Sequence, residues 1–445
     1  MKLPIRIALA LAALPLAAHA EDLLQVYRDA RAHDAQYAAA RYALEAGLES
    51  LPQGRALLLP NIGLTASTVR TDVNTELKDP STVTSVPLGR RHYETNGYQL
   101  TLTQPVFRRQ NFLQHDEAEY QVKQAQATFD QAAQDLILRA AQAYFDVLGA
   151  QDTLELDRAQ TKAISEQLEQ AKRNFEVGTA TIVDTHEAQA RHDLAVSQEI
   201  AAQNDLDNKK RVLEQITGRI YGTLAPLRPD VKLSLPQPNS MDAWVALADK
   251  HAYPVLAQEA GTEIARLESK RAQAGHYPTV DFVATYGYTS QNGTQISTLG
   301  TNVDQGTVGF QLALPLYQGG AISSRARQAA ASYEQGKQNL LNARRTAALN
   351  AQQSYLAVAS GVSQVSALEQ ALVSSQSAYD SNKLGYEVGV RIEIDVLNAQ
   401  QQLYSTKRDL ALARYNTILS ELKLKAAAGS LSDKDLQKVN EALSP

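Results

Sequence analysis

The sequence contains no cysteine among its 445 residues, and it has one tryptophan, two methionines and seven phenylalanines. The lack of cysteine excludes disulfide bonds, thiolate metal ligands and a lipid anchor on an N-terminal cysteine. Few bulky apolar side chains, beside abundant alanine and glutamine, favour thin apolar seams over one large core. Length alone would suggest two or three domains, and this composition argues against such a division.

A strong charge of either sign is missing as well. Lys and Arg number 43 and Asp and Glu number 48, and the net charge of -5 argues against a nucleic-acid binder. No HExxH, GxSxG or phosphate-binding glycine loop is present, and the spacing of His186 and His192 does not place them on one helical face. The sequence therefore predicts neither an enzyme nor a cofactor or metal site. The run Arg90-Arg91-His92 leaves two interpretations open, an anion site or a polar strand end.

Residues 1–20 have the pattern of a secretory signal peptide. Lys2 and Arg6 precede an apolar run that ends in Ala18-His19-Ala20, a small-x-small cleavage site. The alternative is a buried N-terminal helix. We expect the segment to be removed, so that the mature chain begins near Glu21.

Two short stretches, residues 175–184 and 386–395, align without a gap around one glycine each. Gly178 falls on Gly389 in this alignment. Each glycine can supply the backbone angles with which a chain reverses, so each stretch is predicted to be the tip of a helical hairpin. The match indicates an internal duplication, with chance similarity as the alternative.

Long segments without proline surround these tips. Residues 106–225 and 316–444 contain none, and apolar side chains recur there at three- and four-residue steps, as in Ile164, Leu168 and Ala171. This spacing is typical of coiled-coil-like helices with narrow seams and wide polar faces.

We expect the first hairpin to consist of helices over residues 108–174 and 181–217. The first of these would extend roughly 100 Å at about 1.5 Å per residue, which suits a spanning rod better than a compact domain. The return helix is only about half as long. Residues 22–55, and residues 241–274 in the second copy, are therefore predicted to form the helices that cover the remainder.

The apolar period changes to two between residues 60 and 105 and again between residues 278 and 315. Tyr98, Leu100 and Leu102, for example, alternate with polar residues. Alternation over about ten residues, with aromatic residues near the ends, is typical of transmembrane β-strands, and a soluble half-buried sheet is the alternative. Four such strands are expected per chain. The polar stretches expected to form long surface loops are residues 72–89 and 291–306.

Four strands cannot close a barrel in a bilayer, because such barrels need about eight or more and an open edge leaves backbone groups unsatisfied in lipid. We therefore expect a barrel shared between chains, with about eight strands from two chains or about twelve from three. The predicted segments are residues 1–20 (signal peptide), 21–221 (first repeat of helix, two strands and long hairpin), 222–240 (linker), 241–428 (second repeat) and 429–445 (C-terminal segment).

Four motifs at the strand ends and tips are LTQPVF, LALPLYQGG, FEVGTATIVD and GYEVGVRIEIDVLNAQ. With the order of elements, they resemble the TolC family of outer-membrane efflux and type I secretion channels, the outer membrane factors. The resemblance implies a mainly α fold with a transmembrane β-barrel part. Three chains would share a barrel of about twelve strands in outer-membrane lipid, above a long α-helical coiled-coil tunnel in the periplasm. The linker and the C-terminal segment would form an equatorial belt.

The resemblance also implies a passive exit duct for proteins and drugs. It would dock with a periplasmic adaptor protein and an inner-membrane transporter, and the inner hairpins would open it by an iris-like movement. Two other classes stay open: a periplasmic coiled-coil adaptor or structural protein, and an envelope enzyme on a coiled-coil scaffold. Four alternating strands and a whole-chain duplication favour the duct, since an adaptor would carry one hairpin and two β-rich halves.

The second tip carries the gate in that family. The resemblance places Tyr386 and Arg391 at positions that bond to Asp184 on the first tip of the same or a neighbouring chain. It places Asp395 and Asn398 in a ring around the periplasmic entrance, where a family member has two aspartates. Asn398 departs from that pattern and puts the second acidic ring in doubt. Solvated helix ends with local salt bridges are the alternative.

Overall fold

Long helices carry most of the chain. The computed structural model describes residues 21–78, 85–295 and 297–444, so the predicted signal peptide lies outside the described residues. Contacts divide the chain into two units, each of which takes parts of both predicted repeats. The helical unit is the described part of Met1–Ala40, Asp130–Ala252 and Arg345–Pro445, and the strand unit is the described part of Arg41–Phe129 and Tyr253–Arg344.

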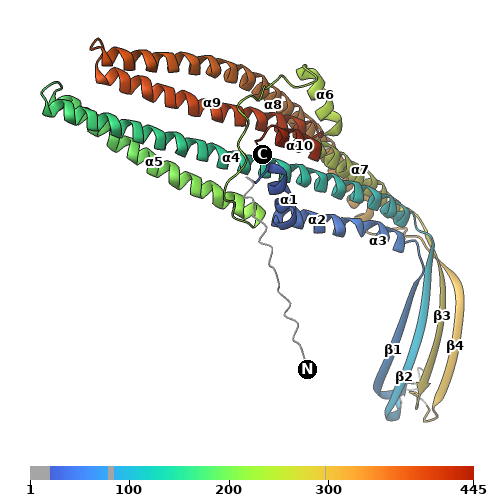
Figure 1. Cartoon of the computed structure of the whole chain (residues 1–445). Coiled ribbons are helices and arrows are strands. Elements are labelled where there is room, and N and C mark those ends of the chain that lie inside the picture. Colours follow the sequence, from blue (N-terminus) through green and yellow to red (C-terminus); the bar gives the residue numbers. More distant parts are fainter. Residues whose placement is uncertain (1–20, 79–84, 296, 445) are drawn as a thin grey trace, which may run out of the picture. The chain divides into compact units, whose positions relative to one another are not determined.

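Two long hairpins build the helical unit (Figure 1). α4 (Arg109–Glu176) returns as α5 (Ile182–Thr217), and α8 (Ala321–Glu387) returns as α9 (Glu393–Ala427). α4 and α8 begin in the strand unit and continue into the helical unit. The two helices predicted for the first hairpin are confirmed, with ends that differ by no more than two residues.

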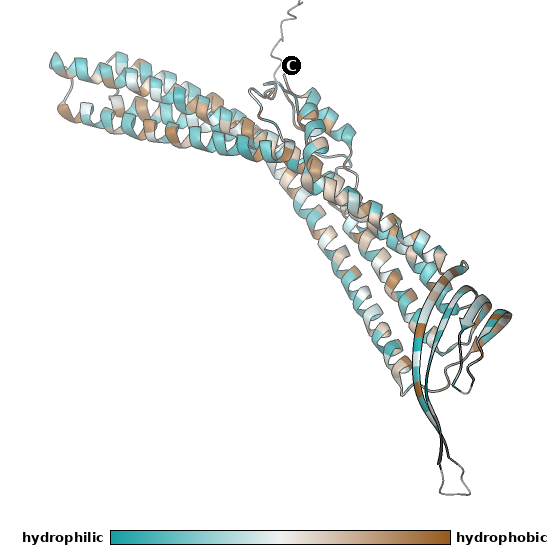
Figure 2. Cartoon of the chain, turned by 90° about the horizontal axis from the view of Figure 1, so that it is seen from below, coloured by the Kyte–Doolittle hydropathy of each residue, from teal (hydrophilic) through white to brown (hydrophobic). Residues whose placement is uncertain are grey.

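Thin apolar seams hold the hairpins together, as the composition predicts. Figure 2 shows hydrophilic residues along the hairpin ribbons with hydrophobic residues interspersed among them. At Gly361 of α8 a Cβ atom would lie 2.5 Å from Thr417 Oγ1 of α9, so glycine allows a close approach of these helices. The buried clusters along the seams, each completed by alanine, are Ile164 with Ala195 and Leu397, Leu168 with Ala171 and Ala188, and Val365 with Leu410 and Ala413.

The two shorter helical segments are broken into pieces, which corrects the expectation of one continuous helix over residues 22–55 and another over residues 241–274. The pieces are α1 (Leu23–His33), α2 (Ala35–Leu48) and α3 (Ser50–Ala56) in the first repeat, and α6 (Met241–His251), α7 (Tyr253–Gln273) and the 3-10 turn η1 (Ala274–His276) in the second. A final helix, α10, spans Asp433–Glu441.

A helix cap explains the break between α1 and α2, and a proline explains the break between α6 and α7. Asp34 follows α1 with an extended backbone (ψ 117°), and its carboxylate accepts a hydrogen bond from the Tyr37 amide at 2.6 Å, which starts α2. Arg139 of α4 donates to both oxygens of Asp34 at 2.7 and 2.9 Å and holds the pKa of this carboxyl below its usual value. In the second repeat Pro254, which has no N–H, occupies the first turn of α7 and favours a fresh helix start.

The proline-rich linker and the C-terminal end lie together in the helical unit. The Arg228 amide donates to the Ala442 carbonyl at 3.0 Å, and the Ser444 amide donates to the Pro226 carbonyl at 2.7 Å. The hydroxyl of Tyr144 donates to the Ala225 carbonyl at 2.7 Å. These bonds tie both segments to the middle of α4.

The strand unit contains one antiparallel sheet in the order β1-β2-β3-β4. Its strands are β1 (Asn61–Lys78), β2 (Ser85–Phe107), β3 (Thr279–Gln291) and β4 (Thr301–Ala313). The register pairs Leu64 with Leu100 and Leu100 with Tyr286, so these side chains share one apolar face. Threonine, glutamine and glycine dominate the other face, and β1 and β4 leave two open edges.

The predicted surface loops are shorter than expected. β1 continues to Lys78, β2 already begins at Ser85, and β4 begins at Thr301, so most of residues 72–89 and part of residues 291–306 are strand. Threonine and valine in these segments favour pairing, and Arg90 forms a cross-strand fork to Asp72 at 2.8 and 2.7 Å. Residues 79–84, within the first predicted loop, lie outside the described residues.

Candidate functional site

The two hairpin tips have the same backbone. Gly178 and Gly389 both have φ of 77°, a left-handed conformation that glycine adopts without strain. The Thr179 amide donates to the Asn174 carbonyl at 2.8 Å, and the Val390 amide donates to the Gly385 carbonyl at 2.9 Å, at corresponding positions of the two tips. The duplicated sequence thus builds a duplicated turn.

Asp184 caps its own helix. Its Oδ2 accepts hydrogen bonds from the amide and the hydroxyl of Thr181, both at 2.8 Å, while the Thr181 Oγ1 accepts from the Asp184 amide at 3.3 Å. This reciprocal capping box satisfies two backbone donors at the start of α5. Both hydrogen bonds to the carboxylate end on Oδ2, so Oδ1 accepts no hydrogen bond in the cap.

Tyr386 contacts the first hairpin through Asn174. The Asn174 side-chain amide donates to the Tyr386 hydroxyl at 3.4 Å. Sequence reasoning missed Asn174, although it directly precedes the first tip motif and is replaced by Gly385 in the second copy. Within the described part of this chain, no hydrogen bond or ion pair joins Asp184 to Tyr386 or Arg391.

Arg391 folds back over its own tip. A Cβ atom on Gly385 would lie 2.7 Å from the Arg391 Cγ, so the glycine makes room for this side chain. The guanidinium lies 3.6 Å from the Asp395 carboxylate, one turn into α9. Both groups are partly exposed, with side-chain exposures of 58% and 35%, so water weakens this pair.

Asn398 has a basic partner that the sequence did not indicate. Arg191 of α5 donates from Nη2 to Asn398 Oδ1 at 3.2 Å and from Nη1 to Gln401 Oε1 at 3.0 Å. Spacing along the sequence carries no signal for this contact, because the two helices are far apart in the chain. The structure therefore places Asn398, one of the two residues predicted to line the entrance, against the first hairpin.

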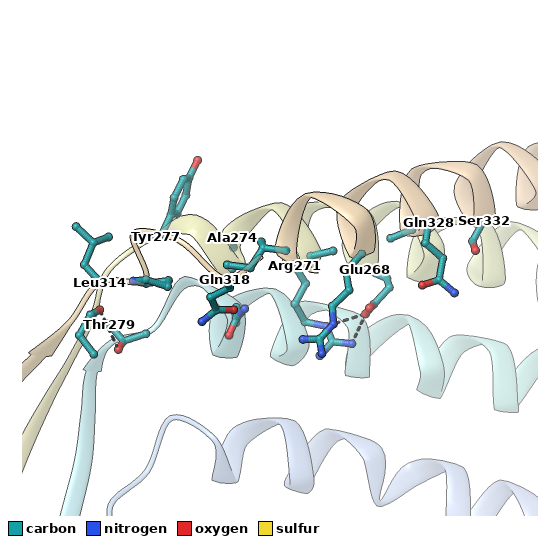
Figure 3. Close-up of a pocket in the computed structure, with 17 residues that line it drawn as sticks. Glu268, Arg271, Ala274, Tyr277, Thr279, Leu314, Gln318, Gln328 and Ser332 are labelled. Carbon is teal, nitrogen blue, oxygen red and sulfur yellow. Dashed lines mark hydrogen bonds and ion pairs between the residues drawn. The ribbon is translucent and has the colours of Figure 1, made fainter. Parts of the chain in front are cut away.

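A cavity of about 1000 Å³ lies in the strand unit, between α7, the start of α8 and the nearby strand ends (Figure 3). Arg271 donates to Glu268, and its Nε also lies 3.2 Å from the buried Glu117 carboxylate. Burial raises the pKa of Glu117 to about 7. Among the described residues, no cluster of His, Asp and Glu could hold a metal ion.

Comparison with known proteins identifies the family. Residues 26–219 and 244–430 match the family described as "Outer membrane efflux protein". The chain belongs to this family. The two matched stretches correspond closely to the regions of the two predicted repeats. The family assignment agrees with the resemblance seen in the motifs at the strand ends and hairpin tips.

Relatives of the efflux family cover nearly the whole chain. The chain is 34% identical to "Outer membrane protein TolC" of Escherichia coli (strain K12) over 451 residues, which cover 99% of this chain and 89% of that protein. It is 30% identical to "Alkaline protease secretion protein AprF" of Pseudomonas aeruginosa, over 95% of this chain and 87% of that protein. These relatives confirm the predicted outer-membrane exit duct for type I secretion and efflux.

Solved structures confirm the fold class. The outer membrane protein VceC from Vibrio cholerae matches with a TM-score of 0.76 at 20% identity, over 92% of this chain and 96% of that chain. The Campylobacter jejuni CmeC outer membrane channel matches with a TM-score of 0.77 at 16% identity, over 95% and 90%. The family match and the 34% identical TolC relative make the chain a channel protein of the outer membrane rather than an enzyme, and the adaptor alternative is set aside.

Proposed function

We propose that three copies of the chain form the duct, with β1 of each copy paired to β4 of the next in a barrel of about twelve strands. The single observation that carries this assembly is a four-strand sheet with one apolar face and two open edges. The exposed apolar surface of α8 supports this assembly. The helix contains an 18-residue apolar window that is long enough to cross a membrane, and only 11% of this window is buried within one chain. A neighbouring copy would cover this surface.

Native mass spectrometry of the detergent-extracted protein tests the assembly. The expected result is a heat-sensitive trimer whose subunits begin near Glu21 and carry no lipid. A stable monomer, or an acylated N-terminus, overturns the proposal.

The duct then works with a periplasmic adaptor and an inner-membrane transporter, and exported proteins and drugs pass through it. The similarity to a protein named for alkaline protease secretion supports protein cargo. The absence of a catalytic motif in the sequence fits a passive role. Deletion of the gene, followed by parallel profiling of secreted proteins and drug susceptibility, tests both kinds of cargo. A mutant unchanged in both would contradict the proposal.

The second tip is the gate of this duct. Because the Asp184 cap uses Oδ2 alone, Oδ1 is available to a tyrosine or arginine from the second tip of a neighbouring copy. Tyr386 and Arg391 supply those donors, and Asp395 and Asn398 line the entrance. Each bond in a wet entrance contributes about 1 kcal/mol, which closes a threefold ring yet lets a docked transporter open it.

A further inference from the structure

Arg191 lies at the seam between the two hairpins. It is on the same helix face as two buried alanines, Ala188 one turn toward the tip and Ala195 one turn away from it. Ala195 packs with Leu397 of α9, the residue next to Asn398. The backbone around Arg191 is therefore fixed by packing, and its side chain reaches α9 from a defined position.

The guanidinium of Arg191 makes a two-pronged contact with α9. Its two terminal nitrogens donate separately to Asn398 Oδ1 at 3.2 Å and to Gln401 Oε1 at 3.0 Å. Asn398 and Gln401 are three residues apart, so their amides lie on one side of the helix and match the planar fork of an arginine. A lysine has the charge but lacks the fork.

The charges around this contact are uneven. Glu187, one turn earlier on α5, lies 3.8 Å from the guanidinium, and the two groups that α9 presents are uncharged amides. A carboxylate in place of Asn398 would meet a cation already in hydrogen-bonding range. At this site, a second acidic ring would therefore be neutralised in part by Arg191.

The corresponding residue of the second hairpin does not bridge helices in this way. Gln402 takes the place of Arg191 in the tip alignment, and its side chain donates to Thr406 of its own helix at 3.3 Å. Of the two aligned positions, only Arg191 of the first hairpin makes the two-pronged contact with another helix.

We infer that Arg191 is a positioning residue of the closed entrance, which ties the inner helix α9 to α5 through the amides of Asn398 and Gln401. It also places a positive charge directly behind the entrance ring and reduces the preference of the closed duct for cations. The inference rests on the proposed gate, since α9 must move away from α5 for the entrance to widen. It goes beyond that proposal because Arg191 lies outside both tips.

Planar-bilayer recordings of purified trimers test this role. Arg191→Gln removes the fork and the charge, and it should raise the closed-state conductance severalfold and increase the cation-to-anion permeability ratio. Arg191→Lys keeps the charge, so it should raise the conductance while the permeability ratio stays near the wild-type value. Arg211→Gln is the matched control, because Arg211 pairs with Glu214 on its own helix at 2.8 Å.

Asn398→Asp provides the reciprocal test. A carboxylate facing Arg191 forms a charge-assisted bond, so the conductance should fall below that of the wild type. Combined with Arg191→Gln, the same change should lose this effect, which a double-mutant cycle measures as coupling. A structural role in folding alone would not produce tighter closure.

The outcomes separate this inference from the proposed gate. If Tyr386→Phe with Arg391→Ala raises the conductance but both Arg191 variants behave as the wild type, the Arg191 inference is overturned and the gate stands. If neither set of variants changes the conductance of intact trimers, both are overturned. An equal effect of Arg211→Gln would also overturn the inference, since that residue makes no fork to α9.

Discussion

The two hairpin tips have the same backbone conformation, and they differ in the hydrogen bonds and ion pairs that their side chains form. In the first tip Thr181 and Asp184 cap α5 with reciprocal hydrogen bonds. In the second tip Ile392 takes the place of Thr181 and forms no side-chain cap, although its backbone is extended in the same way. Asp395, which is aligned with Asp184, forms an ion pair with Arg391 instead.

This difference separates a self-contained turn from one that depends on partners. The first tip completes its helix start locally, so it can serve as a fixed support. The second tip presents a tyrosine, an arginine and an aspartate whose partners lie on other helices or along its own. This difference fits the proposed roles, in which the first tip is a static turn and the second tip is the moving gate.

The largest expected effect comes from making the second tip like the first. Phe175 and Ala180 stand in the first tip where Tyr386 and Arg391 stand in the second, so Tyr386→Phe with Arg391→Ala copies one tip onto the other. Two bonds of about 1 kcal/mol each shift the closed-to-open ratio of one chain by about thirtyfold. Bilayer conductance should rise, and cells should admit large antibiotics.

The matched control for this exchange changes the first tip. Phe175→Tyr with Ala180→Arg should leave conductance near the wild-type level, and each single change in the second tip should have a smaller effect than the pair. Normal trimers with wild-type conductance from the double variant would show that the tips are solvated turns only.

The next effect concerns ions at the entrance. Copies of Asp395 around a narrow axis would concentrate negative charge there, which attracts multivalent cations. Asp395→Ala should abolish the block by a trivalent cation that the wild type shows. Single-channel recordings compare the variant with the wild type. Block that persists in Asp395→Ala would remove this residue from the entrance.

A smaller effect distinguishes the cap of the first tip from its role in the gate. Thr181→Ala removes the capping hydroxyl and should destabilise the start of α5 by about 1 kcal/mol, measurable as faster hydrogen exchange at the tip. It leaves the Asp184 carboxylate for a neighbouring chain, so conductance should change little. Asp184→Ala removes both roles and should resemble the double variant of the second tip.

The smallest effect comes from installing the missing cap. Ile392→Thr creates a capping box with Asp395 three residues later and should stabilise the start of α9 by about 0.5 to 1 kcal/mol. The carboxylate would then turn toward the backbone and away from Arg391. Trivalent-cation block should weaken moderately in bilayers. Stronger block than in the wild type would contradict the assigned geometry.

The sequence was most informative where one physical pattern extends over many residues. The proline-free stretches with three- and four-residue apolar steps located α4 and α5 to within two residues, because helix periodicity is a local property. Single capping events such as Asp34 were missed, since one polar side chain among helical residues has several uses. The continuation of the strands into the predicted loops was missed, because these segments are polar in composition although they contain β-branched residues.

The entrance could be predicted only in part, and for a similar reason. Through a resemblance, the tip motifs predicted Tyr386 and Arg391 as gate residues and Asp395 as an entrance residue, and these roles stay predictions. Arg191 and Asn174 were missed, because each meets a partner about 200 residues away along the chain. Only packing of the seams decides which side chains face each other across two hairpins.

The two open edges of the sheet have a consequence for how the duct is made. A single chain is not stable in the lipid bilayer, because the backbone groups at the open edges of β1 and β4 would face hydrocarbon without hydrogen-bond partners. Insertion and assembly must therefore occur as one event, and its rate must depend steeply on the local supply of chains. Cells that produce little of this protein should lose it to periplasmic proteases rather than accumulate half-built pores.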